Sequence, residues 1–183
     1  RAVTVHGKTY QGDVMIVSLG AEYNEDAIPG LAQAGYNLFT LKGAAAIRDA
    51  WPSFQGGRVV MLTAAPAYKC PAAPYEAALL VDYHLGRLGL RDKSDLSLYA
   101  AEPGPMGTAG PEVSAAVKQM VEGRGVKYFP NHQVTDVDSA RKLIRFANGT
   151  EVTFDLLIYV PPHRAPKAVR DTDLIGESGW IEV

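Results

Sequence analysis

The fold is decided by residues 58–80, RVVMLTAAPAYKCPAAPYEAALL, in which an apolar strand leads into a helix through a proline-rich loop. The run at 58–64 has the length and composition of a buried strand. From about Pro74 to Leu88 the residues follow a helical pattern, and proline is favoured in a first helical turn because its missing N–H is not needed there. A strand, a loop and a helix in this order form the first part of a βαβ unit.

The same alternation continues along the chain. The further predicted elements are a strand at 95–100, a helix at 111–123, a strand at 126–129, antiparallel strands at 133–138, 141–147 and 150–153, and a buried strand at 154–160. Asn148-Gly149 is a turn signal between the last two antiparallel strands. This order predicts an α/β fold, namely a Rossmann-like three-layer domain with a small antiparallel β-meander.

The amino-terminal segment repeats part of this pattern. Residues 3–5 and 8–10 flank His6-Gly7 and predict a hairpin, and the apolar run Asp13–Leu19 predicts a buried strand. In HGKTYQGDVMIV the turn glycine precedes the aspartate by six residues, and NGTEVTFDLLIY has the same spacing. The repeat favours a duplicated nucleotide-binding domain over a chance likeness of two hairpins.

Composition narrows the classes of function. Charged residues make up 21% of the chain and the net charge is −2, so no basic surface for nucleic acid is expected. No apolar run reaches the roughly 20 residues of a membrane span. The single cysteine, Cys70, excludes an internal disulfide and a thiolate metal cluster. Since no histidine pair has metal-ligand spacing, we expect no metal site.

Five segments carry a resemblance to a known family: YQGDVMIVSLGA at 10–21, IPGL at 28–31, YKCPAAPYE at 68–76, FDLLIYVPPHRA at 154–165 and GESGWI at 176–181. The similarity extends over essentially the whole chain, and the cysteine–proline segment is the most specific. The chain resembles the sulfide:quinone oxidoreductase and flavocytochrome c sulfide dehydrogenase branch of the FAD-dependent pyridine nucleotide-disulfide oxidoreductases. The resemblance implies an FAD/NAD(P)-binding type of fold.

The resemblance also implies a domain organisation. Residues 1–21 would be the C-terminal stub of an FAD-binding domain, 22–56 a connecting segment, 57–160 a second dinucleotide-binding-like domain, and 161–183 a truncated return segment toward the FAD domain. The chain begins and ends in strand-like sequence, so we expect a soluble, internal fragment of a longer protein. FAD is the expected cofactor of the parent, with little or no stable binding by the fragment.

The loop at 66–74 bears on the choice of cofactor. Dinucleotide-binding loops use glycines and free N–H groups at a helix N-terminus to hold a pyrophosphate. Here there is no glycine, and Pro66, Pro71 and Pro74 each lack an N–H. NAD(P) binding is therefore not expected. Glu102 stands where a ribose-binding acid would stand, but without those glycines we expect a solvated loop carboxylate.

Cys70 is the first candidate catalytic residue. It lies just before a helix N-terminus and beside Lys69, and both features favour a thiolate. The resemblance implies that this cysteine faces the flavin and takes part in sulfur oxidation with a partner cysteine beyond residue 183. A structural cysteine that packs as a small hydrophobe is the alternative.

Two more residues are candidates for the chemistry. Glu76 opens the helix after the cysteine loop, where the resemblance implies a carboxylate near the flavin, although such a residue also complements the helix dipole. His163 follows a strand's carboxyl end and titrates near neutral pH, so it could move protons, or it could be a surface residue in a proline-stiffened loop. Predicted cofactor contacts are Gly20, Ala21, Pro161 and Pro162.

The resulting hypothesis is a flavin-dependent oxidoreductase that oxidises sulfide or a related reduced sulfur compound and passes electrons to a quinone or a cytochrome. An NADH:quinone-type dehydrogenase and a non-catalytic Rossmann-like assembly module are the alternatives. No nucleic-acid partner is expected, whereas a region beyond residue 183 could contact a membrane surface. The sequence assigns no compartment: a cytoplasmic or periplasmic parent, membrane-associated or not, is compatible with it.

Overall fold

The computed structural model describes residues 2–182, which divide into two compact units. The larger unit holds Tyr23–His163, and the smaller unit is built from the segments before and after it. The chain passes from one unit to the other at β3 (Glu22–Tyr23) and β12 (His163–Arg164).

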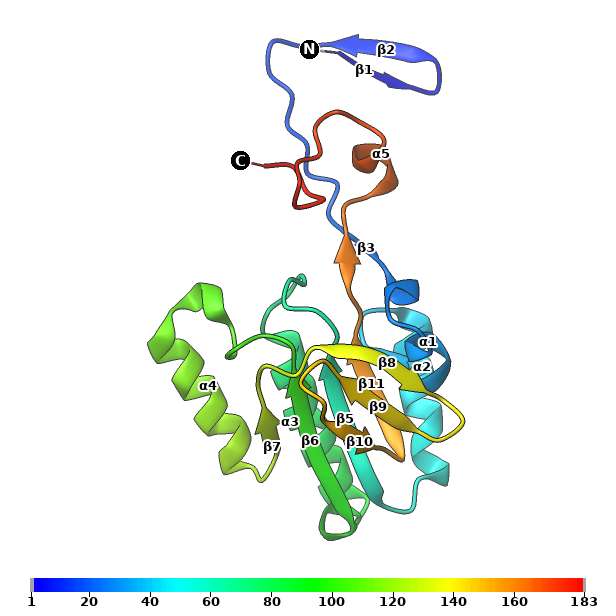
Figure 1. Cartoon of the computed structure of the whole chain (residues 1–183), viewed down its shortest axis with the longest axis vertical. Coiled ribbons are helices and arrows are strands. Elements are labelled where there is room, and N and C mark those ends of the chain that lie inside the picture. The colour runs from blue at the N-terminus through cyan, green and yellow to red at the C-terminus, as the bar shows by residue number, and fades with distance from the viewer. Residues whose placement is uncertain (1, 183) are drawn as a thin grey trace. The chain divides into compact units, whose positions relative to one another are not determined.

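A five-stranded parallel sheet forms the middle of the larger unit (Figure 1). Its strands, in spatial order, are β4 (Tyr36–Asn37), β11 (Leu156–Val160), β5 (Gly57–Thr63), β6 (Ser94–Ala100) and β7 (Lys127–Phe129). Because all five strands are parallel, the loops after β5, β6 and β11 all lie at the carboxyl ends of the strands. Ligands bind at these ends in open α/β sheets.

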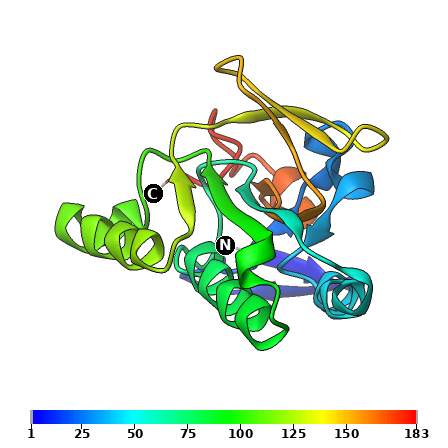
Figure 2. The ribbon, with the colours of Figure 1, turned by 90° about the horizontal axis from the view of Figure 1, so that it is seen from below.

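The two faces of the sheet are covered differently, as Figure 2 shows. Helices α2 (Leu41–Ala50), α3 (Ala73–Arg87) and α4 (Pro111–Gly123) cover one face, and the meander of β8 (Val134–Asp138), β9 (Leu143–Phe146) and β10 (Glu151–Thr153) covers the other.

Side chains along β5 point alternately to the two faces of the sheet and so contribute to the hydrophobic core on each face. Val59 and Met61 pack in the cluster that includes α3, whereas Val60 and Leu62 pack in the cluster that includes the meander. The predicted three-layer α/β fold with a small antiparallel meander is confirmed.

The segment 23–56 contributes more than a connection, since β4 joins the sheet edge. The other short elements of the larger unit are η1 (Glu25–Ala27), α1 (Leu31–Ala34), η2 (Trp51–Ser53), η3 (Arg91–Lys93) and η4 (Gly107–Ala109). Gly30 precedes α1 with φ of 76°, and a Cβ there would lie 1.8 Å from the Val137 oxygen. This glycine therefore allows α1 to dock against β8.

The smaller unit contains the predicted hairpin, β1 (Ala2–Val5) and β2 (Lys8–Gln11), and one short helix, α5 (Lys167–Arg170). The prediction of a buried strand at Asp13–Leu19 is wrong. This stretch forms no strand, and Val14 and Ile16 are 82% and 88% exposed. A strand needs a neighbour for its backbone hydrogen bonds, and within residues 2–182 this stretch has none.

Candidate functional site

Cys70 lies in the loop that joins β5 to α3 and is exposed. Its φ of 56° is left-handed, which is uncommon for a residue with a Cβ and costs about 1–2 kcal/mol. Its carbonyl oxygen accepts a 3.0 Å hydrogen bond from the Ala73 N–H at the start of α3. A strained conformation persists only where the surroundings fix it, so the origin of that constraint is part of the site.

Glu102, which follows β6, is bound by residues on both sides of Cys70. Oε1 of this carboxylate accepts 2.6 Å hydrogen bonds from the hydroxyls of Tyr68 and Tyr75, and Oε2 accepts one of 2.6 Å from Thr63. Tyr68 precedes Cys70 in its loop and Tyr75 lies in the first turn of α3. The prediction that Glu102 is a solvated loop carboxylate is wrong, since the residue is only 7% exposed.

The electrostatics of this cluster favour neutral hydroxyl donors. Burial, followed by the charge of Glu102, raises the pKa of Tyr68 and of Tyr75 well above that of free tyrosine. Both hydroxyls therefore keep their protons at neutral pH and can donate to the carboxylate. Three charge-assisted hydrogen bonds stabilise a buried carboxylate that has no ion-pair partner within residues 2–182.

A pocket of about 920 Å³ lies beside this cluster at the carboxyl ends of β5 and β6. Residues 66–71 form one wall, with Cys70 among them, and Glu102 contributes to the lining. The remaining wall is the loop and first turn of α4, contributed by Pro103, Gly104, Met106, Gly107, Thr108, Gly110, Pro111 and Ser114. The thiol is thus accessible next to a concave, mixed polar and apolar surface, as a small-molecule site requires.

His163 occupies an aromatic environment after β11. Its Nδ1 lies 2.9 Å from the Pro161 carbonyl oxygen, which only accepts, so Nδ1 carries the proton. Nε2 is buried without a hydrogen-bond partner, and the rings of Tyr23 and Phe39 lie 5.3 and 5.7 Å away, edge-on. Burial, and then the charge of Lys69, lowers the pKa of His163. A neutral imidazole with a free lone pair results.

Lys69 links the cysteine loop to this histidine group. Its ammonium lies 4.6 Å from the centre of the Tyr23 ring, within the range of a cation–π interaction. Among the described residues, no hydrogen bond joins Cys70, Glu76 and His163 to one another. Lys69 is thus the loop residue whose charge acts on the histidine.

The other predicted site residues lie as follows. Glu76 is exposed in the first turn of α3. Pro161 and Pro162 are buried, and their carbonyl oxygens accept hydrogen bonds from His163 and from the Asn24 N–H. Gly20 has φ of 73° and lines a pocket of about 850 Å³ in the smaller unit, whereas Ala21 does not line it. Their roles as cofactor contacts stay predictions.

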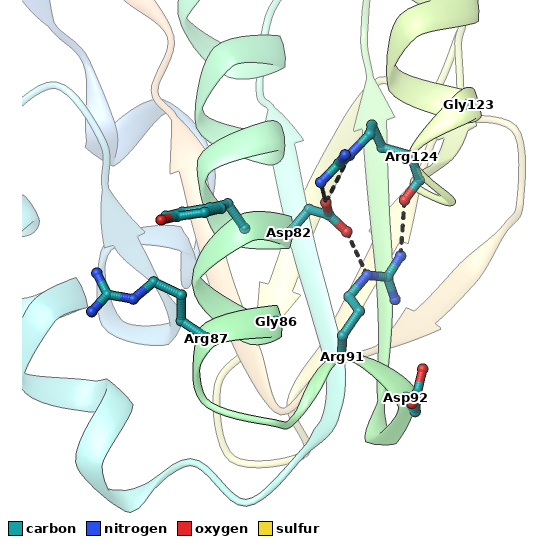
Figure 3. A pocket seen from close by; sticks show the side chains of 8 residues that line it. Asp82, Gly86, Arg87, Arg91, Asp92, Gly123 and Arg124 are labelled. Carbon is teal, nitrogen blue, oxygen red and sulfur yellow. Dashed lines mark hydrogen bonds and ion pairs between the residues drawn. The ribbon is translucent and has the colours of Figure 1, made fainter.

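A further pocket, of about 720 Å³, is lined by an ion-pair network (Figure 3). Asp82 of α3, 6% exposed, accepts from Arg91 Nε at 2.5 Å and from Arg124 Nη2 at 2.9 Å. Arg91 also donates to the carbonyl oxygens of Ser94 and Gly125. Since Asp82, Arg91 and Arg124 all bind groups of the protein itself, the network joins α3 to the end of α4 and is structural.

Sequence reasoning missed the tyrosine–carboxylate cluster. Tyr68 and Tyr75 flank Cys70 by two and five residues, and Glu102 follows the adjacent parallel strand. The available signal was that adjacent parallel strands bring the loops that follow them to the same end of the sheet.

Within residues 2–182 no group of three or more His, Cys, Asp or Glu side chains is arranged to hold a metal ion.

The parallel sheet, its helical layer and the opposing meander define a Rossmann-like domain of the kind found in FAD/NAD-binding oxidoreductases. A mitochondrial sulfide:quinone oxidoreductase from Dictyostelium discoideum is 25% identical over 191 residues, covering 99% of this chain and 42% of that protein. A sulfide-quinone reductase from Aquifex aeolicus is 24% identical over 180 residues, covering 91% and 40%. The chain thus spans about two fifths of these relatives' length.

The crystal structure of the sulfide:quinone oxidoreductase from Aquifex aeolicus superimposes with a TM-score of 0.77 at 19% identity, covering 100% of this chain and 44% of that one. No family model matches the chain. The resemblance inferred from the sequence is confirmed: along nearly its whole length the chain is similar to part of the sulfide:quinone oxidoreductases. None of the helices in residues 2–182 has the length and apolarity needed to cross a bilayer.

Proposed function

We propose that this chain is the part of a flavin-dependent sulfide-oxidising oxidoreductase that carries a redox-active cysteine, Cys70. The observation that carries the proposal is that Cys70 is exposed, held in a left-handed conformation, and placed on the wall of a pocket at the carboxyl ends of the central strands. Rigid support of a solvent-accessible thiol is what nucleophilic sulfur chemistry requires. The similarity to sulfide:quinone oxidoreductases supports sulfide as substrate and a quinone as acceptor.

The proposed step is thiol–disulfide chemistry. A hydrosulfide ion attacks a disulfide between Cys70 and a second cysteine. Since Cys70 is the only cysteine of this chain, the second one belongs to another part of the whole protein. The S–S bond breaks, one cysteine carries the new persulfide, and the other leaves as a thiolate. A second hydrosulfide ion attacks the outer sulfur of the persulfide and carries it away as hydrogen disulfide, which leaves both cysteines as thiolates. Re-forming the S–S bond between them releases two electrons, and a bound FAD would supply the chemistry that accepts these electrons and transfers them to the quinone.

The residues near Cys70 have supporting roles in this proposal. Neutral His163 accepts a proton at Nε2, and Lys69 supplies positive charge between the thiol loop and the imidazole. Glu76, exposed in the first turn of α3, faces solvent and remains a candidate proton carrier.

The backbone at Gly20 is open to a ligand in the smaller unit. A Cβ added at Gly20 would meet nothing within 4 Å, and the residue lines a pocket, so a ligand can approach the backbone there. Gly20 and Ala21 are therefore the proposed FAD contacts of the smaller unit, and Pro161 and Pro162 those of the larger unit.

The NADH-dependent alternative has less support. The loop after β5 has no glycine, and the oxygens of Glu102 already accept hydrogen bonds from Tyr68, Tyr75 and Thr63 and so are not free for a ribose.

The test of the proposed function uses the full-length protein loaded with FAD and kept anaerobic. Rapid bleaching of the flavin by sulfide, but not by NADH, is expected. Bleaching by NADH alone would show that the proline-rich loop admits a nicotinamide and would overturn the proposal.

A further inference from the structure

One buried carboxylate holds both ends of the Cys70 loop. The Tyr68 hydroxyl, two residues before Cys70, and the Tyr75 hydroxyl, five residues after it, both end on Oε1 of Glu102 at 2.6 Å. The other oxygen, Oε2, is bound by the Thr63 hydroxyl at the end of β5. Thr63 in turn accepts a 3.0 Å hydrogen bond from the Ala101 N–H, so the carboxylate is itself fixed to the sheet.

Glu102 is also fixed through its backbone. Its carbonyl oxygen accepts a 3.1 Å hydrogen bond from the Asn131 N–H, and the Ala100 carbonyl accepts one of 2.8 Å from His132. The residue is 7% exposed and belongs to no ion pair among the described residues. A buried carboxylate without a cation is costly unless hydrogen bonds replace its water. Its three hydroxyl donors therefore indicate a role that an apolar residue, without acceptor oxygens, would not fill.

The loop needs such an anchor. Pro66, Pro71 and Pro74 stiffen it, but Cys70 lies between them at φ of 56°. Within residues 2–182, its one backbone hydrogen bond is the turn closed by the Ala73 N–H. In the part of the chain that the structure describes, no other hydrogen bond joins the loop to the neighbouring strand. Without the two tyrosine contacts, the left-handed conformation would relax toward more favourable backbone angles.

We infer that Glu102 is a positioning residue: through Tyr68 and Tyr75 it fixes the Cys70 loop and so holds the thiol at one place on the pocket wall. This inference deepens the proposed function and rests on it only for the role of Cys70. Glu102 itself touches no reacting atom. Its effect passes through the two tyrosine hydroxyls, which burial keeps protonated.

The first test measures amide hydrogen exchange at Ala73, Tyr75 and Glu76 of the 183-residue chain, because their N–H groups bind the Cys70 and Ala72 carbonyl oxygens and so report on the Cys70 loop. Glu102→Ala and Tyr68→Phe should each speed exchange in this loop by about tenfold or more, with β7 and β8 unchanged. Glu102→Gln keeps an acceptor oxygen for both tyrosines and should restore most of the protection. Glu112→Ala removes an exposed carboxylate from the first turn of α4 and is the matched control, expected to match wild type.

Coupling between the residues makes the test sharper. Because Tyr68 acts through Glu102, Tyr68→Phe should add nothing in the Glu102→Ala background. Unchanged loop exchange in Glu102→Ala, or a full additional effect of Tyr68→Phe in that background, would overturn the inference. If Glu102→Ala fails to fold, Tyr68→Phe and Tyr75→Phe carry the same comparison with a smaller change.

The second test uses the full-length FAD-loaded protein. Glu102→Ala should lower the limiting rate of sulfide-driven flavin bleaching about tenfold while the half-saturating sulfide concentration changes less than twofold, because misplacing the thiol lowers the reactive fraction. Cys70→Ser separates the two proposals. If it bleaches normally, the proposed function fails while loop exchange still decides the role of Glu102. If only Glu102→Ala bleaches normally, the positioning role fails.

Discussion

Tyr68 donates a 2.6 Å hydrogen bond to Glu102, which lies 34 residues further along the chain. The contact joins the loop after β5 to the loop after β6. It therefore links the loop of the only cysteine of the chain to a buried residue at the carboxyl end of the sheet. The loop that carries Cys70 is therefore hydrogen-bonded to a residue that follows a different strand.

This contact predicts a measurable stability change. Tyr68→Phe removes one hydroxyl donor from a buried carboxylate, and hydrogen bonds to charged groups are worth about 1.5–3 kcal/mol. Urea denaturation should show a loss of free energy of unfolding in that range. Tyr83→Phe, in the exposed part of α3, is the matched control and should change it by less than about 0.5 kcal/mol. Equal effects of the two variants would contradict the account.

Alkaline pH should destabilise the larger unit. Burial raises the pKa of Tyr128 to about 12, and burial with the charge of Glu102 raises the pKa of Tyr68 and Tyr75 further. Folded-state pKa values above the unfolded value of about 10 mean that the fold prefers the protonated form. The contribution is complete below about pH 10 and is lost as the pH rises through the folded pKa values.

Tyrosinate absorbance during an alkaline titration checks this prediction. A class of tyrosines should ionise late, together with unfolding, and Tyr128→Phe should remove the step near pH 12. Ionisation of every tyrosine in one step near pH 10, with the fold intact, would be the opposite result.

His163 should stay neutral under mildly acidic conditions. Burial and the charge of Lys69 lower its pKa below the ordinary value of 6.5. Since the unfolded chain takes up this proton first, the stability contribution is present above pH 6.5 and is lost as the pH falls through the folded pKa. An NMR titration should show the depressed midpoint, and Lys69→Gln should raise it. Lys93→Gln, far along the chain, should not. A midpoint above 6.5 in the folded protein would refute this.

Asp82 should matter for folding rather than for chemistry. Removing one partner of a buried ion pair costs about 3–5 kcal/mol, but Arg124 is 58% exposed, so we expect about 2–3 kcal/mol for Asp82→Asn. Asp95→Asn breaks a surface pair with Lys127 and should cost less than about 1 kcal/mol. Chemical denaturation of both variants gives the comparison, and a larger loss for Asp95→Asn would contradict the structural role of the network.

The sequence predicted the β5–α3–β6–α4–β7 succession closely, because each element carries its own length and period. The prediction of α4 at 111–123 matches the structure at both ends, where Pro111 opens the helix and Gly123 closes it. The two-residue strand β4 has no comparable pattern, since its place in the sheet depends on pairing with Ile158 and Tyr159.

Predictions that required a distant partner were less accurate. The apolar run Asp13–Leu19 indicates side chains that need burial, but it does not indicate which strand would pair with it. Within residues 2–182 no strand pairs with this run. Glu102 was misassigned for the same reason. A glutamate in a proline- and glycine-rich loop is usually solvated, and its burial here depends on hydroxyls from Tyr68 and Tyr75.

The central claim, that Cys70 carries the sulfur chemistry, is tested most directly by comparing wild type and Cys70→Ser in the full-length FAD-loaded protein. Both are mixed anaerobically with sulfide, and the rate of flavin bleaching is recorded. Serine keeps the size of the side chain but cannot form a disulfide or a persulfide, so the account predicts at least a hundredfold loss of rate, on the order of 3 kcal/mol. Bleaching at the wild-type rate in Cys70→Ser would contradict it.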